Sequence, residues 1–459
     1  PRPGSEGILA LSIADVLLRE GLCPPGPEQR LVDFARYQKL ASQFPPRAAS
    51  SQTGISPAAI AETARTLAQR PSIVLAGADP GGGPFDRLTE TLVSSLNPLL
   101  GNVGRPGGIL ERRSLPPAYP AVVPATVLTE VPDRSISFLI IDSADDGMAF
   151  PAALLRRKLT GDDATVVSLS PYLSARSALA DYLVPAPAAY ESMEEVVTPS
   201  GAVQASCSVS LPLMKPPQGA MHPALFIGKL ADAAGISGLP TATDESLVRQ
   251  RVDSLYASRS GSVVSAADGT RRKVSDLGSA DELWTAMNGG DCWLDDKAGT
   301  ARPQRFAVLE RFPDAKLQDV GTMSPPAGGP LTLMPAGWRA AIDSGALSPL
   351  MSKVFQESDL RDVAGRVFVN PSTAASAGVK SGGRALVRTR TGSATVTVVE
   401  SEAVMPGVIS GVVGPLPNGA TTGDELTNDD VLALCDLQED GTWRLTGATL
   451  GRADEGGRS

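Results

Sequence analysis

The side chains that most often bind metals or act as nucleophiles are few in this chain of 459 residues, which has one histidine. Its four cysteines are Cys23, Cys207, Cys292 and Cys435. Because no two of them form a Cys-x-x-Cys pair, the sequence predicts buried free thiols and argues against a local zinc or iron–sulfur site. The single imidazole, His222, precedes Pro223 and is predicted to be structural. One imidazole supplies no multi-histidine metal centre and leaves almost no room for a Ser-His-Asp triad.

Two glycine-rich turns could bring backbone N–H groups close to an anion. "DPGGGPFD" lacks the glycine spacing of a dinucleotide or phosphate loop, and Asp79 and Asp86 would repel a phosphate, so we interpret it as a structural turn. "GNVGRPGG" (101–108) is more informative. Gly101 is predicted to close the preceding helix as a left-handed C-cap, and Arg105 lies on a loop that can approach a backbone or an anion.

Pairs of acidic residues occur in "DSADDG" and "YESMEE", but nothing near them forms a general acid and base. No nucleophile lies in a recognisable pattern with a base. The residues alone therefore indicate a protein with no self-contained catalytic apparatus.

Length and composition limit the class of protein. A chain of 459 residues is expected to form two to four domains. Its formal charge of −9 argues against nucleic-acid binding, and no stretch is apolar enough to predict a membrane span. With 42% hydrophobic residues and 4% aromatic residues, the composition is that of a globular protein whose core is rich in Ala, Val and Leu.

The first half of the chain alternates helix and strand patterns. A helix is predicted at residues 4–22, with Leu9, Ile13, Val16 and Leu17 on one stripe and Gly21 as its end. Another is predicted after Ser56, with Pro57 at its first position. The apolar run "SIVLAGA" (72–78) predicts a buried strand, followed by a helix that carries Leu88, Leu92, Leu96 and Leu99.

The same alternation continues, and then the pattern changes. Strands are predicted in "SISFLIIDSA", "ATVVSLSP" and "ADYLVPAP", and helices in "AFPAALLRRKL" and "HPALFIGKLADAAGI". Residues 240–330 are predicted to be an irregular insertion or linker. Beyond residue 330, alternating β-branched and polar residues between glycine turns predict a small β-barrel. We expect domains at 1–120, at 121–330 and at 331–459.

Five segments of the chain resemble the large subunits of the molybdopterin-dinucleotide oxidoreductases, the dimethyl sulfoxide reductase superfamily, and they follow one another as they do in that family. The most specific is "SSLNPLLGNVGRPGGI". The others are "RPGSEGILALSIADVLLREGL", "SPYLSARSALADYLVPAPAAYE", "SPLMSKVFQESDLR" and "VFVNPSTAASAGVKSGGRALVRTRTGSATVTVVESEAVMPGVI". The resemblance implies two doubly wound dinucleotide-fold-like α/β domains followed by a barrel of the double-psi type.

By this resemblance, nine residues are candidates for facing a molybdopterin guanine dinucleotide, although structural turns are the more common use of such residues. They are Gly101, Asn102, Gly104, Arg105, Gly107, Gly108, Asn370, Gly382 and Gly383. Relatives carry their iron–sulfur cysteines and molybdenum ligand before the first matching segment, where this chain begins. The resemblance therefore assigns this chain no catalytic residue, no metal ligand and no bound cofactor.

Several positions differ from the family pattern in ways that disfavour the cofactor. Asp142, Asp145 and Asp146 stand where relatives have a Gly-x-Asn-Pro turn, and three carboxylates would repel a pyrophosphate. Ser168 or Ser170 replaces the aspartate that reads guanine in relatives. The segment around Trp338 and Arg339 lacks the histidine-containing cofactor loop.

The resemblance is nearest to the cofactor-less molybdopterin-like subunits of menaquinone reductase and alternative complex III. It implies a non-catalytic scaffold on the periplasmic side of a quinone-linked respiratory membrane complex. The implied partners are an iron–sulfur subunit, a multihaem cytochrome and quinone-reactive membrane subunits. Two other hypotheses remain open: the C-terminal part of a catalytic bis-molybdopterin enzyme, whose missing strands would leave open sheet edges, and a small-molecule or sugar-binding protein.

Overall fold

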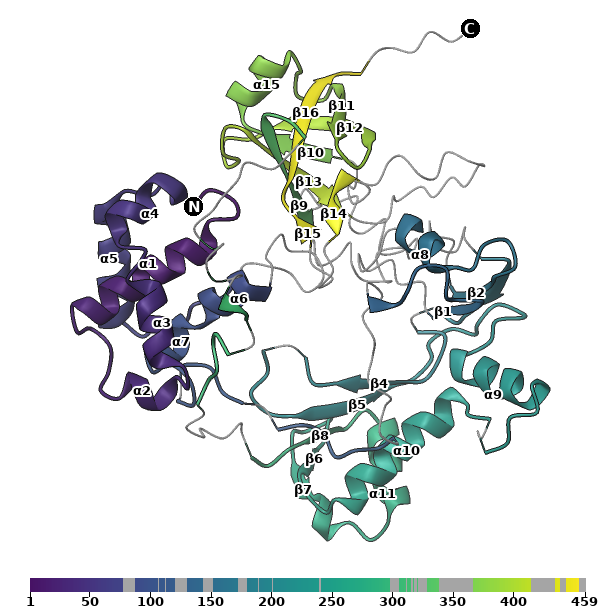
Figure 1. Cartoon of the computed structure of the whole chain (residues 1–459). Helices are drawn as coiled ribbons and strands as arrows, with labels where there is room; N and C mark the ends of the chain where they lie inside the picture. Colours follow the sequence, from purple (N-terminus) through teal and green to yellow (C-terminus); the bar gives the residue numbers. More distant parts are fainter. Residues whose placement is uncertain are drawn as a thin grey trace, which may run out of the picture.

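The computed structural model contains four regions, which Figure 1 shows in the colours of the sequence. They are a group of helices at the N-terminus, a parallel sheet, a second sheet with two helices, and a C-terminal barrel. The structure describes residues 1–76, 87–105, 107–111, 113–119, 130–142, 152–171, 180–188, 190–199, 201–238, 241–297, 305–310, 312–314, 317, 320, 328–337, 366–413, 434–437 and 443–453. Together these regions confirm the predicted combination of α/β architecture and a terminal barrel.

The N-terminal region is built around one buried helix, α1 (Glu6–Arg19). The helices beside it are α2 (Pro27–Arg30), α3 (Phe34–Ala41), α4 (Pro46–Thr53), α5 (Pro57–Gln69), α6 (Arg87–Ser94) and α7 (Leu96–Leu99). Residues 7, 8 and 10–17 of α1 are all buried, so the helix is covered on every side rather than along the single predicted stripe. The predicted cap of α5 is confirmed, because the Ser56 hydroxyl accepts a hydrogen bond from the Ala59 amide at 3.2 Å.

A distant segment completes this helical core. Val308, Leu309 and Phe312 are buried in the same hydrophobic cluster as α1. The Asp33 carboxylate accepts hydrogen bonds from the amides of Val308 and Leu309. Part of the range that we assigned to the second domain therefore packs in the first, because its buried apolar side chains and its hydrogen bonds to the partly buried Asp33 carboxylate hold it there.

The strand predicted at 72–78 is wrong over its described part. Residues 72–76 belong to no strand, and the side chains of Ile73 and Leu75 are 43% and 77% exposed. The cause is that the side chains of Asn97 and Asn102 form hydrogen bonds with the backbone groups that would otherwise pair with a neighbouring strand. Residues 77–78 and the turn with Asp79 and Asp86 lie outside the described residues.

The second region is a three-stranded parallel sheet in the order β1-β2-β3, which confirms the predicted strand positions. Its elements are β1 (Phe138–Asp142), α8 (Ala152–Lys158), β2 (Thr165–Ser170) and β3 (Tyr182–Pro185). Helix α9 (Pro223–Ala233) follows later in the chain. The central strand is the most buried, with Val166, Val167 and Leu169 each less than 7% exposed. A continuous apolar run thus takes the two-sided burial that parallel sheets provide.

The third region shows that the irregular insertion predicted for 240–330 is wrong for residues 241–297. Its elements are β4 (Glu194–Val197), β5 (Ser206–Ser210), α10 (Asp244–Ala257), β6 (Ser262–Val264), β7 (Arg271–Lys273), η3 (Val274–Asp276), α11 (Ala280–Asn288) and β8 (Cys292–Leu294). The strands form a sheet in the order β4-β5-β8-β6-β7. Trp293 is buried at its centre, against Val252 and Leu283 of the two helices. Polar surface residues conceal this short-strand pattern from sequence reading, while Thr243 and Ser279 cap the helices.

The fourth region confirms the predicted barrel. Six strands close in the order β10-β12-β11-β16-β9-β13. They are β9 (Leu331–Gly337), β10 (Arg366–Val369), β11 (Arg384–Thr389), β12 (Ser393–Glu400), β13 (Val408–Val413) and β16 (Thr446–Arg452), with helix α15 (Pro371–Ala377) and the short pair β14 (Asp436–Leu437) and β15 (Trp443–Arg444) beside them. Along β12 the residues alternate between buried and less buried, which is the period of a half-buried strand.

Candidate functional site

The glycine loop, residues 101–108, begins where α7 ends. The Gly101 amide donates to the Pro98 carbonyl at 3.1 Å, and Gly101 has a φ of +67°, so its predicted role as a left-handed C-cap is confirmed. Gly104 and Gly107 also have a φ of +78° each. Three of the loop's four glycines therefore occupy backbone conformations that side chains disfavour.

The glycine loop closes on itself through backbone hydrogen bonds. The Gly104 amide donates to the Ile109 carbonyl at 2.8 Å, and the Ile109 amide donates to the Asn102 carbonyl at 2.8 Å. A Cβ atom on Gly108 would lie 1.9 Å from that same Asn102 carbonyl oxygen. Gly108 is thus required by the closure of the loop, without any ligand.

Two buried asparagines tie the glycine loop to the extended segment at 72–74. The Asn97 side chain accepts from the Val74 amide at 2.9 Å and donates to the Val74 carbonyl at 2.6 Å. The Asn102 side chain donates to the Ser72 carbonyl at 2.6 Å. Both asparagines are at most 2% exposed, so their amide groups replace the missing neighbour strand. Asn97 was not among the predicted site residues, although a polar residue between Leu96 and Pro98 in an apolar run is a signal that could have marked it.

Two arginines stabilise the ends of this arrangement. Arg105 donates to the Asn102 side-chain oxygen, and its own side chain is exposed. Arg30 donates to four carbonyls, those of Pro24, Pro25, Pro98 and Leu99, at 2.7–3.2 Å. Burial lowers the pKa of the Arg30 guanidinium, which still compensates the carbonyls at the end of α7. Nothing in the local sequence identifies Arg30, because its partners are all backbone atoms.

The three barrel candidates are held within the barrel. The Asn370 side chain caps α15 by accepting from the Ser372 amide at 3.1 Å, and it donates to the Val404 carbonyl at 2.9 Å. The Gly382 amide donates to the Val398 carbonyl at 2.8 Å, and the Val398 amide donates to Gly383 at 3.0 Å. These residues serve as a helix cap and as a turn between strands, and their hydrogen bonds do not reach the glycine loop.

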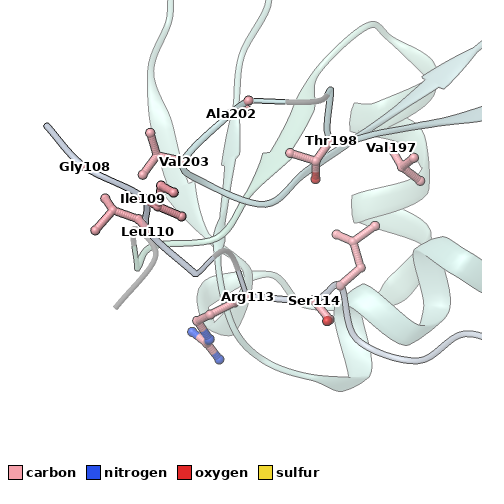
Figure 2. A pocket seen from close by; sticks show the side chains of 11 residues that line it. Gly108, Ile109, Leu110, Arg113, Ser114, Val197, Thr198, Ala202 and Val203 are labelled. Carbon is pink, nitrogen blue, oxygen red and sulfur yellow. The ribbon is translucent and has the colours of Figure 1, made fainter. Parts of the chain in front are cut away.

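A groove of about 860 Å³ lies beside the exit of the glycine loop. Figure 2 shows Ile109, Leu110 and Val203 close together at one end of it, with Gly108 next to them, and Thr198 and Val197 at the other end. Arg113 lies at its margin and forms an ion pair at 3.1 Å with Asp295, whose side chain is 5% exposed. Of the nine candidates, Gly108 alone lines this groove, and Arg113 is already neutralised.

The positions that differ from the family pattern lie mostly outside the described residues, among them Asp145, Asp146, Trp338 and Arg339. Asp142 ends β1 and is exposed. Ser168 is fully buried in β2, and its hydroxyl has no hydrogen-bond partner in the described structure. A serine here occupies little space and offers no charge, so it could not replace a base-reading carboxylate.

The predicted burial of the thiols is confirmed for Cys207 and Cys435 and is wrong for Cys23 and Cys292, which are only partly buried. The histidine has the structural role predicted for it. The four cysteines, all among the described residues, form no disulfide, and Cys207 and Cys435 are buried. Burial raises the pKa of Cys207 to about 12 and that of Cys23 to about 11, so both thiols are protonated at neutral pH. His222 caps α9 by accepting from the Ala224 amide at 3.2 Å. Within the described ranges no three His, Cys, Asp or Glu side chains are grouped to hold a metal, and no helix there could cross a bilayer.

The candidate side chains among the described residues already have partners within the chain. The side chains of Asn102, Arg105 and Asn370 are engaged within the chain. The Asn102 carbonyl occupies the space where a side chain on Gly108 would lie, whereas the space around Gly107 is open. A pterin or pyrophosphate would have to break these hydrogen bonds to be bound by the same groups.

Comparisons with known proteins agree with this fold. Residues 352–431 match the family described as Molydopterin dinucleotide binding domain. The menaquinone reductase molybdopterin-binding-like subunit of Nitratidesulfovibrio vulgaris is 24% identical over 474 residues, which cover 98% of this chain and 61% of that protein. Acetylene hydratase from Pelobacter acetylenicus has a similar structure, with a TM-score of 0.67 and 15% identity over 98% of this chain and 71% of that one. This chain therefore spans about three fifths of the length of its curated relative.

Proposed function

This chain belongs to the molybdopterin-dinucleotide oxidoreductase (dimethyl sulfoxide reductase) superfamily, and from this premise we propose that it is a non-catalytic scaffold subunit of a quinone-linked respiratory electron-transfer complex. It holds iron–sulfur, multihaem cytochrome and quinone-reactive membrane subunits in place and transfers no electrons itself. The complex works on the periplasmic side of the inner membrane. Catalytic residues, metal ligands and a resident cofactor have no part in this role.

Similarity over nearly the whole chain supports the proposal. The Nitratidesulfovibrio vulgaris relative is named as a molybdopterin-binding-like subunit of menaquinone reductase, and 98% of this chain aligns with it. The word subunit in that name indicates that the relative is part of an assembly of several chains.

One structural observation carries the non-catalytic part of the proposal. The side chains best placed to meet a cofactor are used inside the chain: Asn102 bonds the Ser72 carbonyl, and Arg105 bonds Asn102. Asn97, which precedes them, is bonded twice to Val74. A loop with these internal bonds is a stable structural element in its own right, which is what a scaffold requires.

The test is the cofactor content of the complex isolated through a tag on this chain. We expect molybdenum and tungsten far below one atom per chain, and no fluorescent pterin after oxidation, while haem and iron co-purify. Stoichiometric molybdenum or tungsten on this subunit would refute the proposal. A chain that is recovered without any redox subunit would contradict the scaffold role.

The second candidate function is that of the C-terminal part of a catalytic bis-molybdopterin guanine dinucleotide oxidoreductase. The match of residues 352–431 to a dinucleotide-binding domain favours it. Intact-mass measurement of the native polypeptide tests this candidate. A mass close to 47.4 kDa favours the scaffold, and a much heavier polypeptide with bound pterin favours the enzyme.

A further inference from the structure

The five-stranded sheet has two edges of opposite character. At one edge, β7 consists of Arg271, Arg272 and Lys273, all exposed. A run of basic residues is a common protection of an edge strand against pairing with another chain. At the other edge, β4 has Val196 and Val197, which are 50% and 47% exposed. Of the two edge strands of this sheet, only β4 has exposed apolar side chains.

Further exposed apolar residues extend this edge. We define the β4 edge surface by six side chains that are each about half exposed or more: Tyr190, Val196, Val197, Val203, Leu213 and Met214. The amides of Leu213 and Met214 both donate to the Tyr190 carbonyl, at 2.8 and 3.0 Å, which places them next to the start of β4. Contiguous exposed apolar residues of this kind mark protein interaction sites.

The backbone at Tyr190 is held in an unfavourable conformation that presents its ring to solvent. Its φ is +69°, in the left-handed region that a bulky residue rarely adopts. The two hydrogen bonds to its carbonyl keep it there. Strain retained at an exposed aromatic residue is typical of a binding surface rather than of a solvent-facing loop.

The groove of about 860 Å³ continues the β4 edge surface at its other end. Val197 and Val203 belong to both, and Ile109 and Leu115 also line the groove. A strand added beside β4 would therefore place a side chain into a preformed groove whose lining is part apolar and part polar. Strand addition takes affinity from main-chain hydrogen bonds and specificity from such pockets.

The charged residues of β4 indicate which side chains a partner strand has. Glu194 begins β4 and is exposed, with no ion pair among the described residues, whereas Glu195 is bound to Arg251 at 2.6 Å. The complementary partner has apolar side chains toward Val197 and the groove, and a lysine or arginine beside Glu194. A second copy of this chain would instead place two Glu194-bearing edges together, or it would meet β4 with β7, which offers basic residues but no apolar side chain for Val197 and the groove.

We propose that the β4 edge is the docking site for an extended segment of a different subunit, which adds a strand to this sheet and inserts an apolar side chain into the groove. This proposal rests on the scaffold function, and it names the surface by which the scaffold holds a partner. The partner segment is a polypeptide strand with alternating apolar residues and a basic residue at one end.

Hydrogen exchange measures the state of the edge directly. The probe is the backbone of residues 194–197 in the complex isolated from the native organism, compared with the chain separated from its partners. We expect these amides to exchange at least about tenfold more slowly in the complex, with no change at residues 271–273. Equal exchange rates in the two states would overturn the proposal.

A substitution at the edge provides the second test. Val197→Lys adds a charge at a half-exposed side chain, so the fold is kept, and we expect the fraction of chain recovered in the full-size complex to fall about tenfold. Arg271→Ala, on the opposite edge, changes the net charge by one unit in the opposite direction and should have no effect on assembly. Full assembly of the Val197→Lys chain would contradict the proposal, and so would light scattering that shows a dimer closed through β4.

These outcomes separate the docking proposal from the proposed function. Normal assembly of the Val197→Lys chain with the haem and iron subunits would refute docking at the β4 edge and would leave the scaffold role supported. Molybdenum bound to the subunit would refute the non-catalytic role. Hydrogen exchange at β4 would still test the docking proposal in that case. If the wild-type chain is isolated alone, fast exchange at 194–197 counts against both.

Discussion

The glycine loop at 101–108 and the turns of the barrel look alike in sequence, yet they are held by different means. In the barrel, Gly382 and Gly383 exchange backbone hydrogen bonds with Val398 of β12. In the glycine loop, side-chain amides do this work, since Asn97 and Asn102 bond the backbone of residues 72–74. One region depends on a pattern of strands, and the other depends on particular side chains.

This difference explains how each region tolerates change. A barrel turn is stabilised by many similar ladder bonds on both sides, so no single side chain decides its shape. The glycine loop has no ladder, and each buried amide satisfies backbone groups that water does not reach. The hydrogen bonds within the fold by themselves therefore account for Asn97, Asn102 and Gly108.

The largest expected effect is at Gly108. Gly108→Ala places a Cβ 1.9 Å from the Asn102 carbonyl oxygen, and we expect a loss of roughly 3–5 kcal/mol in the free energy of unfolding. Gly107→Ala is the matched control, since a Cβ there meets open space and pays only for its φ of +78°, about 1 kcal/mol. Urea denaturation compares the two. Similar losses for both would show that the loop is not closed as described.

The next effect is at Asn97. Asn97→Ala leaves both the amide and the carbonyl of Val74 without a partner, so we expect a loss of about 2–3 kcal/mol. Asn102→Ala frees one backbone carbonyl, that of Ser72, and should cost about 1–2 kcal/mol. Thermal unfolding gives the order of the two. A smaller loss of stability for Asn97→Ala than for Asn102→Ala would contradict the view that side-chain hydrogen bonds, rather than strand pairing, hold the glycine loop.

In the barrel, the effect at Asn370 should be smaller. Asn370→Ala removes the cap of α15 and the bond to the Val404 carbonyl, with an expected loss of about 1 kcal/mol. Asn370→Asp keeps the oxygen that accepts from Ser372 and should recover more than half of it. Denaturation of both variants tests this, and a loss as large as that of Asn97→Ala would contradict the comparison.

A further expected effect is a pH dependence of stability next to the glycine loop, which appears only at alkaline pH. Burial raises the pKa of Cys23 from 9.0 to about 11, so the unfolded chain releases this proton first. Stability is therefore complete below pH 9.0, falls as the pH rises through that value, and stops falling above about 11. Urea titrations at several alkaline pH values measure the slope. Cys23→Ala should flatten it, and an unchanged slope would show that other groups cause it.

Much of the architecture was predictable because it follows from periodicity. The alternation along 393–400 predicts a half-buried strand, and the apolar run at 165–170 predicts a strand covered on both faces. Ser56 before Pro57 predicts a helix start from local hydrogen bonding alone. These features depend on neighbours within a few residues, so an isolated sequence contains them.

Other features could not be read in this way. The run at 72–78 is as apolar as the strand at 165–170, yet its described part pairs with asparagine side chains instead of a strand. Residues 241–297 look polar and irregular, yet Trp293 gathers their short strands and two helices into one core. Short elements of this kind have no distinct period of their own, and long-range packing decides their form.

The sequence by itself determined the α/β elements, the terminal barrel, the glycine turns and the absence of a histidine-based centre, because residue type and spacing act over short distances. The tertiary structure decided which polar groups are already used. It brought Asn97 and Asn102 to residues 72–74, sent residues 308–312 back to the first core, and left β4 open while basic side chains cover β7. Burial and hydrogen-bond partnership belong to the whole fold, and no local pattern can specify them.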